Sequence, residues 1–429
     1  MKILILYYNI ILISLFSNRT EMKNEFSKMD AGSLHLANKK VLLKLINQRG
    51  QISRSELSKE TRLTPPSVTR IVDELVYTDK LAEYIGTGSS NGGRPAMIVK
   101  FKNENNYIIG IDLGATYIRG GLVDLNAKFI SEIQVPTEID KGFSSIIEKV
   151  IKVIKKLESR KEANSKIWGI GIGVAGLVDS KTGIIEVSPD FGWSNINLRK
   201  ELEDKLDLPF FYDNSTRLMA LGELKLGTKQ NIKNFALLNI GYGIASGLVI
   251  EGNLVKGRAG FAGEFGHIPV DTESNVRCKC GMLGCLEALA SGNRIAALGK
   301  QEFENNKSEK LRELCNNNPN LVTAELVAKA AKMGDETCLK IYNDVMEYFC
   351  KGIGIISNLL NPEAVYLGGG ISLNGEFIFD LIQSKKSKYL LQANANMPIL
   401  PSTYGEQATT IGAVSLVLKK ILNLELVLK

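Results

Sequence analysis

Three apolar segments of this chain each run directly into a glycine-rich turn, and this repeated pattern limits the folds open to the chain. The segments 107–112, 235–240 and 364–366 have the composition of buried strands. Backbone N–H groups in such a turn form a nest that can hold phosphate. Three such turns predict two similar α/β lobes that close over a cleft. The residues of the first two turns that we predict as phosphate contacts are Asp112, Gly114, Thr116, Gly241 and Gly243.

The length of the chain, 429 residues, exceeds what one hydrophobic core accommodates, so two or three domains are expected. The composition is that of an ordinary globular protein, with 44% hydrophobic and 23% charged residues. Of the six cysteines, three crowd into the segment 278–285 and the other three are scattered. That distribution is typical of a reducing compartment rather than of a secreted disulfide scaffold, and it predicts a cytoplasmic protein.

The segment 1–21 differs from the rest of the chain. Its apolar run, 3–16, is shorter than the roughly 20 residues that a membrane-spanning helix needs, and a good cleavage site for a signal peptide is missing. Export would also oxidise the clustered cysteines. We therefore expect a disordered or non-native leader, translation that starts at Met22 or Met29, and no membrane partner.

The positive charge of the chain is concentrated near its N-terminus. Residues 22–102 carry 14 Lys and Arg against 8 Asp and Glu, which is +6 of the net charge of +7. The chain after Lys102 therefore has a net charge of about zero. A basic module on a neutral body predicts a head that binds a polyanion, here double-stranded DNA.

The segment 38–75 has the pattern of three short helices. Gly50 ends the first helix, Ser53 and Glu56 form a capping box for the second, and Thr64-Pro65 starts the third. Each helix offers apolar residues at helical spacing for a shared core. These are Val41, Leu42, Leu45 and Ile46 in the first, Leu57 in the second, and Val68, Ile71, Val72 and Leu75 in the third.

The outer face of the third helix is polar and carries an arginine, which is the layout that enters a major groove. Two strand-like segments, 81–85 and 96–101, flank a Gly/Ser loop and predict a wing that reaches a minor groove. A small helical protein-interaction domain with a solvated charged face is the alternative. The predicted DNA contacts are Arg54, Ser67, Thr69, Arg70 and, in the wing, Arg94.

One of the two histidines of the chain precedes the cysteine cluster closely enough to share a metal ion with it. Zinc accepts imidazole nitrogen and thiolate sulfur in a tetrahedron, and a closed structural site needs four such ligands. Gly281 and Gly284 let the loop fold back tightly. Free buried thiols are the alternative. The predicted zinc ligands are His267, Cys278, Cys280 and Cys285.

The segment 260–267, the Cys-x-Cys-Gly-x-x-Gly-Cys-x-Glu run at 278–287 and the Asp112 turn together resemble the ROK family (repressors, open reading frames, kinases). The N-terminal module resembles the repressor branch of that family, the NagC/XylR type, and the resemblance covers the chain from Asn38 onward. It implies an actin-like fold of two ribonuclease-H-like lobes, a sugar in the cleft, structural zinc and homo-oligomerisation.

The resemblance also implies that Asn214, Glu264, His267 and Glu287 bind the sugar. Carboxylates and imidazole can make the several hydrogen bonds that a polyol requires. The alternative for Glu264 and Glu287 is that they orient the metal ligands.

The kinases of that family place a catalytic aspartate after the asparagine of an Asn-Asp-x-Asn-Ala-x-Ala-Leu-Gly-Glu pattern. The register set by residues 220–223 puts Ser215 on the aspartate and Arg217 on the second asparagine. Serine is no general base near pH 7, and Asp213 replaces it only with a two-residue slip. Ala115 and Tyr242 also depart from the nucleotide-binding turns. The phosphate contacts are therefore expected to be vestigial, with no catalytic residue and no ATP requirement.

These inferences combine into a predicted sugar-responsive transcriptional repressor, a homodimer or homotetramer whose effector is a small sugar or sugar phosphate, with xylose the first guess. A sugar kinase with a regulatory DNA-binding head and a zinc-stabilised scaffold without a ligand are the alternatives. The predicted fold class is α/β, with a winged helix-turn-helix before a two-lobed actin-like fold. The expected boundaries are 22–103 for the DNA-binding domain and 104–429 for the sugar-binding domain, in which lobe 1 spans about 104–222 plus the C-terminal helix and lobe 2 about 223–409.

Overall fold

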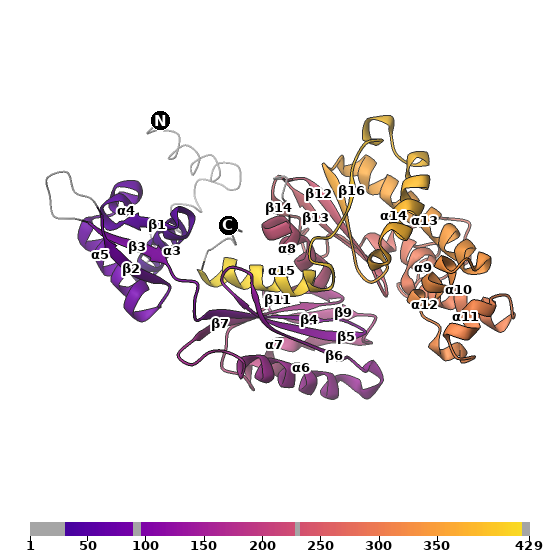
Figure 1. The fold of residues 1–429 in the computed structure, drawn as a ribbon, viewed down its shortest axis with the longest axis horizontal. Coiled ribbons are helices and arrows are strands. Elements are labelled where there is room, and N and C mark those ends of the chain that lie inside the picture. Colours follow the sequence, from indigo (N-terminus) through magenta and orange to yellow (C-terminus); the bar gives the residue numbers. More distant parts are fainter. Residues whose placement is uncertain (1–30, 89–95, 228–231, 423–429) are drawn as a thin grey trace. The chain divides into compact units, whose positions relative to one another are not determined.

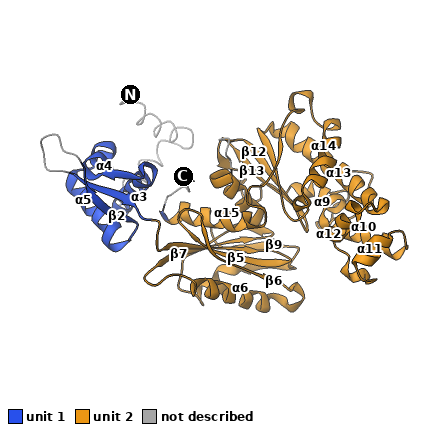
Figure 2. Ribbon diagram, viewed as in Figure 1, with its two compact units in different colours: residues 1–102, 422–424 blue, residues 103–421, 425–429 orange. Residues whose placement is uncertain are grey.

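The computed structural model consists of two compact units, one made mainly of residues up to Lys102 and the other mainly of residues from Asn103 (Figures 1 and 2). The structure describes residues 31–88, 96–227 and 232–422. The predicted leader and the predicted wing residue Arg94 lie outside these ranges. Within them, no helix combines the length and the apolar character that crossing a membrane requires.

The first unit packs helices against a three-stranded antiparallel sheet of order β1-β3-β2. The strands expected at 81–85 and 96–101 pair with each other, and a short third strand joins them. The elements are α3 (Ala31–Arg49), β1 (Gln51–Ser53), α4 (Arg54–Thr61), α5 (Pro65–Asp73) with its π-helical continuation η1 (Glu74–Thr78), β2 (Ala82–Thr87) and β3 (Met97–Phe101).

The helix caps of this unit are those that the sequence predicts. Ser53 Oγ accepts a hydrogen bond from Glu56 N at 3.2 Å, and Ser53 N donates to Glu56 Oε2 at 2.9 Å. Thr64 caps α5, with Pro65 in its first turn. The apolar residues predicted for the second and third helices are all buried, namely Leu57, Val68, Ile71, Val72 and Leu75.

The prediction for the first helix is wrong in two respects. Helix α3 starts at Ala31, well before the expected start at Asn38. Val41 is 50% exposed, whereas Leu43, which was not predicted, is buried together with Leu42. Because α3 packs against both α5 and β3, the face that it buries includes Leu43.

The second unit contains two sheets of the same topology. Their strand orders are β11-β7-β4-β5-β6 and β14-β13-β12-β15-β16. In each sheet the first three strands along the chain are antiparallel neighbours, and the next two add in parallel on the other side. The two similar α/β lobes predicted from the glycine-rich turns are therefore present.

Lobe 1 is the half of the second unit built on the first of these sheets. Helix α15 packs closely against one face of this sheet, and glycines of the sheet permit the approach. A Cβ at Gly110 or Gly171 would lie within 2.4 Å of a backbone carbonyl oxygen of α15. Its elements are β4 (Asn106–Leu113), β5 (Tyr117–Asp124), β6 (Phe129–Pro136), α6 (Gly142–Glu158), β7 (Lys166–Val174), β8 (Leu177–Val178), β9 (Ile184–Ser188), β10 (Trp193–Asn197), α7 (Leu198–Glu203), β11 (Phe210–Asn214), α8 (Ser215–Gly222) and α15 (Ala408–Val417).

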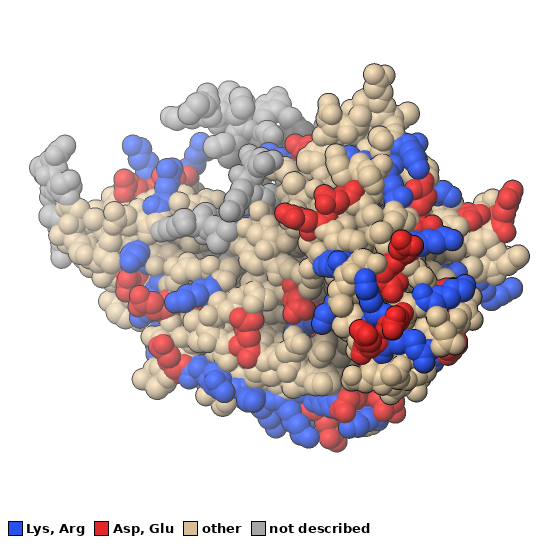
Figure 3. All heavy atoms as spheres, turned by 45° about the vertical axis from the view of Figure 1, so that its right-hand side comes forward, with Lys and Arg blue, Asp and Glu red and all other residues tan. Residues whose placement is uncertain are grey.

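Lobe 2 has the more extensive helical layer, in which α9, α10, α12 and α14 all contact the long helix α13. Acidic and basic side chains are interspersed over this lobe where it comes forward in Figure 3. Its elements are β12 (Phe235–Ile240), β13 (Ile244–Ile250), β14 (Asn253–Leu254), α9 (Leu286–Ala290), α10 (Gly292–Glu304), α11 (Glu309–Leu314), α12 (Ala324–Lys332), α13 (Glu336–Leu360), β15 (Ala364–Gly368), α14 (Glu376–Lys385) and β16 (Ile399–Pro401).

Candidate functional site

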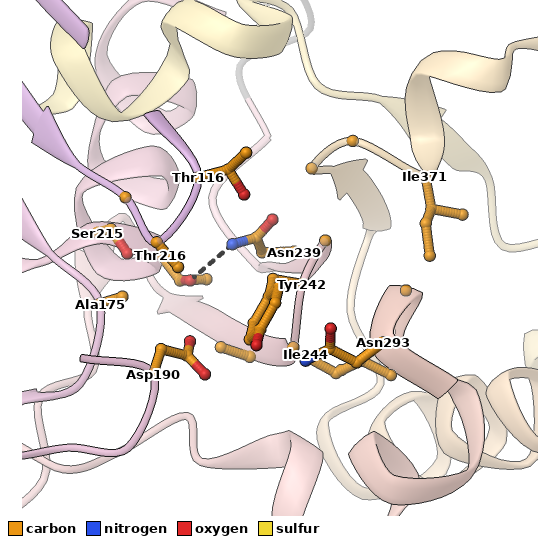
Figure 4. Close-up of a pocket in the computed structure, with 18 of the residues that line it drawn as sticks. Thr116, Ala175, Asp190, Ser215, Thr216, Asn239, Tyr242, Ile244, Asn293 and Ile371 are labelled. Carbon is orange, nitrogen blue, oxygen red and sulfur yellow. Dashed lines mark hydrogen bonds between the residues drawn. The ribbon is translucent and has the colours of Figure 1, made fainter. Parts of the chain in front are cut away.

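A cavity of about 800 Å³ lies between the two lobes, and all three predicted glycine-rich turns contribute to its wall (Figure 4). The turns follow β4 and β12, the equivalent central strands of the two sheets, and β15, the parallel neighbour of β12. The residues of the turns that line the cavity include Asp112, Gly114, Thr116, Gly241, Gly243, Gly369 and Gly370. A cavity at this switch in the connectivity is where α/β proteins usually bind small molecules.

The first turn holds a buried carboxyl group. Asp112 is 8% exposed, and Arg119 Nη1 lies 3.8 Å from its Oδ2. Burial raises the pKa of Asp112 to about 6, although the guanidinium of Arg119 and a hydrogen bond from Thr409 both act to lower it. Arg119 also pairs with Glu406 at 3.3 Å. A cation therefore lies beside the carboxyl group in the wall of the cavity.

The junction between β11 and α8 carries Asn214 and Ser215, and both line the cavity. Asn214 caps α8, since its Oδ1 accepts a hydrogen bond from Arg217 N at 3.0 Å. Its Nδ2 donates to Gly176 O at 2.9 Å. Each polar atom of the Asn214 amide thus makes one hydrogen bond within the protein and has capacity for a second. Ser215, the first residue of α8, presents a hydroxyl group where the sequence comparison with kinases places a carboxylate.

Asp213 does not line the cavity, and its carboxylate is committed to two cations. Arg217 Nη2 lies 2.5 Å from Asp213 Oδ1, and Lys256 Nζ lies 2.7 Å from Asp213 Oδ2. Arg217 is 2% exposed and also donates hydrogen bonds to the backbone oxygens of Val178 and Gly260. The idea that Asp213 replaces the missing base is therefore contradicted by this geometry.

The four predicted metal ligands form one cluster, in which the potential donor atoms all lie within 4.8 Å of one another. Cys278 Sγ lies 3.5 Å from His267 Nδ1, and Cys280 Sγ lies 3.7 Å from Cys285 Sγ. One nitrogen and three sulfur donors at this separation suit a thiophilic ion in a tetrahedral site. The cluster can therefore hold a metal ion.

Backbone geometry explains how the short cysteine loop closes. Cys278 N donates to Met282 O at 2.8 Å, and Gly281 N donates to Cys278 O at 2.9 Å. Gly284 has a φ of 67°, and a Cβ there would lie 1.8 Å from Asp271 O. Glycine is thus required at position 284, as the sequence suggests.

His267 joins the metal cluster to the cavity. Its Nδ1 faces Cys278, while its Nε2 lies 4.0 Å from Glu264 Oε2, which is too long for a hydrogen bond. Glu264, His267 and Glu287 all line the cavity. Burial raises the pKa of Glu264, against the lowering effects of His267 and Arg217. One imidazole can therefore serve a metal ion and face a ligand.

Glu287 supports the second glycine-rich turn. Its Oε2 accepts a hydrogen bond from Ile244 N at 2.9 Å, and a Cβ at Gly243 would lie 2.3 Å from the same oxygen. Tyr242, in the same turn, is 44% exposed and projects into the cavity (Figure 4). The tyrosine ring therefore occupies space in the cavity next to the glycine-rich turns.

Four of the five predicted DNA-contact residues lie on α4 and α5 of the first unit, and the fifth, Arg94, lies outside the described residues. Arg70 is exposed, and its Nη2 lies 3.3 Å from His35 Nδ1. Arg54 is more constrained, because its Nη1 lies 3.9 Å from Asp73 Oδ1 and its guanidinium lies over the Tyr84 ring. The two remaining residues, both partly buried, are Ser67 and Thr69.

Sequence reasoning missed three charged groups. These are Arg119 in the wall of the cavity, Lys256 on the carboxylate of Asp213, and Lys279 on the carboxylate of Asp190. Lys279 carried a weak signal, because it stands between two metal ligands. The sequence gives no signal for Arg119 or Lys256. The partner of Arg119 is Glu406 and that of Lys256 is Asp213, and both partners are remote in the sequence.

The ROK family model matches residues 108–420 of the chain. The xylose repressor of Caldicellulosiruptor bescii is 30% identical over 90% of this chain and 96% of its own length. The solved structure of a ROK family transcriptional regulator, a homologue of the E. coli MLC protein, covers 90% of this chain and 96% of its own, with 27% identity and a TM-score of 0.72. A ROK family glucokinase from Streptomyces griseus, solved with glucose and AMPPNP, covers 72% of this chain and 98% of its own, with 27% identity and a TM-score of 0.66.

The match therefore includes the cavity, the metal cluster and both lobes, and the repressor and regulator relatives extend over most of the first unit as well. This chain belongs to the ROK family.

Proposed function

We propose that this protein is a sugar-responsive, DNA-binding transcriptional repressor of carbohydrate-utilisation genes in the cytoplasm. The observation that carries the proposal is that one chain combines a basic helical unit with a cavity. At the β11–α8 junction, this cavity presents Ser215 instead of a carboxylate. The similarity to a xylose repressor over 90% of the chain supports it and makes xylose the first effector to test.

The first unit is proposed to be a winged helix-turn-helix. Helices α4 and α5 follow each other after a short turn, and β2 and β3 form the antiparallel pair of the wing. The exposed face of α5 would enter a major groove with Arg70, Ser67 and Thr69, while Arg54 and Arg94 contact the backbone or the minor groove. A symmetric operator needs two copies of this unit, so we propose a homodimer or a homotetramer.

The cavity is proposed to bind a sugar through Asn214, Glu264, His267 and Glu287. The carboxylates and the imidazole supply several acceptors and donors on one wall, as a polyol requires. His267, Cys278, Cys280 and Cys285 would hold a zinc ion, which supplies structural cross-linking of the loop rather than an open catalytic position. Glu264, near the Nε2 of His267, would contact the sugar and also orient the ring.

Phosphoryl transfer to the sugar is proposed to be absent. It requires a carboxylate that accepts the hydroxyl proton and a site for the triphosphate of ATP. Ser215 provides no such base, Arg217 and Lys256 neutralise Asp213, and Tyr242 fills space near the phosphate turns. The phosphate contacts Asp112, Gly114, Thr116, Gly241 and Gly243 would then be vestigial.

Nuclease footprinting of the full-length protein on the DNA upstream of its own gene tests this function. Protection of a symmetric site that is lost on addition of D-xylose, D-glucose or another simple sugar is the expected result. Absence of protection at moderate salt, with and without sugars, would contradict it.

Relatives of this chain include a glucokinase, which makes a kinase the second candidate function. A coupled assay of ATP consumption with a panel of hexoses and pentoses separates the two. The repressor predicts no turnover above the rate without sugar, whereas sugar-dependent turnover abolished by Ser215→Ala would establish the kinase.

A further inference from the structure

A lysine of the loop that carries the predicted metal ligands contacts an aspartate of the opposite lobe, and this aspartate lines the cavity. Lys279 stands between Cys278 and Cys280 in lobe 2, and its Nζ lies 3.3 Å from Oδ1 of Asp190 in lobe 1. The same Nζ lies 4.9 Å from the centre of the Tyr242 ring. The two residues of this ion pair are 89 positions apart in the sequence.

The segment that carries the aspartate of this pair is anchored by buried aromatic rings. Asp190 lies in the connection between β9 and β10, directly before two buried aromatic residues. The rings of Phe191 and Trp193 stack with centroids 4.4 Å apart, and Phe143 meets Trp193 edge-on at 5.1 Å. These ring contacts anchor the backbone that follows Asp190.

The lysine end is fixed by the loop that presents the metal ligands. The hydrogen bond from Cys278 N to Met282 O closes the loop around Lys279, and Arg277 Nη1 donates to Gly281 O at 2.9 Å. A metal ion bound by Cys278 and Cys280 would hold the backbone on both sides of the lysine. Two constrained segments thus meet through one charged pair.

The pair lies at the cavity itself. Asp190 and Tyr242 both line the cavity, and the close-up shows the carboxylate of Asp190 on the same side as the tyrosine ring (Figure 4). Tyr242 comes from the turn after β12 in lobe 2 and Asp190 from lobe 1. The ammonium group of Lys279 therefore contacts a wall residue from each lobe.

We propose that Lys279 is a positioning residue, whose ion pair with Asp190 holds the two lobes at the separation that binds the effector sugar. This inference rests on the proposed function and adds to it the way in which the metal loop acts on the cavity. A ligand that needs the closed arrangement binds more weakly when that arrangement is less populated. The pair thereby preorganises the cavity before the sugar arrives.

Charge reversal at each end of the pair tests the inference. Isothermal titration calorimetry with D-xylose, D-glucose and N-acetylglucosamine would be run on the full-length wild type, Lys279→Asp, Asp190→Lys and the double variant. Each single reversal is expected to weaken sugar binding about three- to tenfold, and less so at high salt, since the pair is partly exposed. The double variant, which restores opposite charges, is expected to return to within about twofold of the wild type.

Two further readouts separate positioning from a general structural role. Lys279→Arg keeps the charge and is expected to bind sugar as the wild type does. Zinc content is expected to stay unchanged in all variants. Amide hydrogen exchange in the segment 184–197 is expected to increase in both single reversals and to stay unchanged in Lys279→Arg and in the double variant. Unchanged sugar affinity in Lys279→Asp would overturn the inference.

A double variant as weak as Asp190→Lys would also overturn it, because Asp190 would then contact the sugar directly. Failure of the wild type to bind any sugar is a separate outcome that contradicts the proposed function and this inference together. If the wild type binds sugar and the single variants bind it equally well, the inference is contradicted and the proposed function is not.

Discussion

Arg217 Nη2 lies 2.5 Å from Asp213 Oδ1, and both side chains are almost completely buried. The two residues face each other across one turn at the start of α8, with Lys256 on the second carboxylate oxygen. This arrangement ties the last strand of lobe 1 to the loop of lobe 2 that leads to Glu264. It also removes the only carboxylate near Ser215 in the sequence from the chemistry of the cavity.

Replacing Arg217 with methionine should destabilise the protein. The change keeps the bulk of the side chain but leaves the buried Asp213 carboxylate with one cation, and loss of a buried partner costs about 3 kcal/mol or more. Urea unfolding followed by circular dichroism measures the effect. Lys256→Met, which removes a 41% exposed partner, is the control and should cost less than about 1 kcal/mol. Equal and small effects from both changes would contradict this reading of the ion pair.

Asp112 should make stability depend on pH. Its pKa is raised by burial to about 6 in the folded protein, above the value of 3.8 for the free side chain. The folded state therefore holds the proton more tightly, so the stabilising contribution is complete below about pH 4 and is lost as pH rises through about 6. The difference corresponds to about 3 kcal/mol.

Asp112→Asn removes this titration while keeping the shape of the side chain. The unfolding free energy of the wild type should fall, relative to that of the variant, between pH 4 and pH 7. If the unfolding free energies of the two proteins instead change in parallel with pH, Asp112 is ionised throughout this range and the prediction is wrong.

Removal of the metal ion should increase the mobility of the loop that carries Lys279 and of the His267 side chain. Cys285→Ala is expected to lose the bound zinc, to lower the unfolding free energy by about 3 kcal/mol and to weaken sugar binding. Metal content by atomic absorption and calorimetric sugar titration are the measurements. Cys315→Ala, also a buried cysteine of lobe 2 but outside the cluster, should keep its zinc and its sugar affinity. Full zinc content in Cys285→Ala would refute the assignment of the ligands.

Arg70→Ala should weaken operator binding by about tenfold or more, because a groove contact from an arginine contributes about 1–3 kcal/mol. Arg160→Ala, a change of an exposed arginine in the second unit, is the matched control and should bind as the wild type does. Electrophoretic mobility shifts at fixed salt measure both. If the two variants bind equally well, α5 does not present Arg70 to DNA.

Short-range signals in the sequence were sufficient for much of the fold. The capping box of Ser53 and Glu56 depends only on neighbours within a few residues, so residue type alone specifies it. The metal cluster was predictable for the same reason, since three of its four ligands fall within eight positions and glycines fix the loop between them.

Contacts between remote segments could not be predicted from one sequence. Lys256 and Asp213 are 43 positions apart, and nothing local to either residue indicates the other. The buried face of α3 was misjudged for a related reason. Helical periodicity identifies a stripe of apolar residues, but the neighbours α5 and β3 decide that Leu43 rather than Val41 is buried.

The most direct test of the central claim is the reciprocal effect of sugar and operator on each other. Fluorescence anisotropy gives the affinity of the full-length protein for its operator with and without saturating D-xylose or another sugar that it binds. Calorimetry gives the sugar affinity with and without operator DNA. The account predicts that sugar weakens operator binding and that DNA weakens sugar binding by the same factor, about 5- to 150-fold. Operator affinity that stays unchanged when the cavity is saturated with sugar would contradict it.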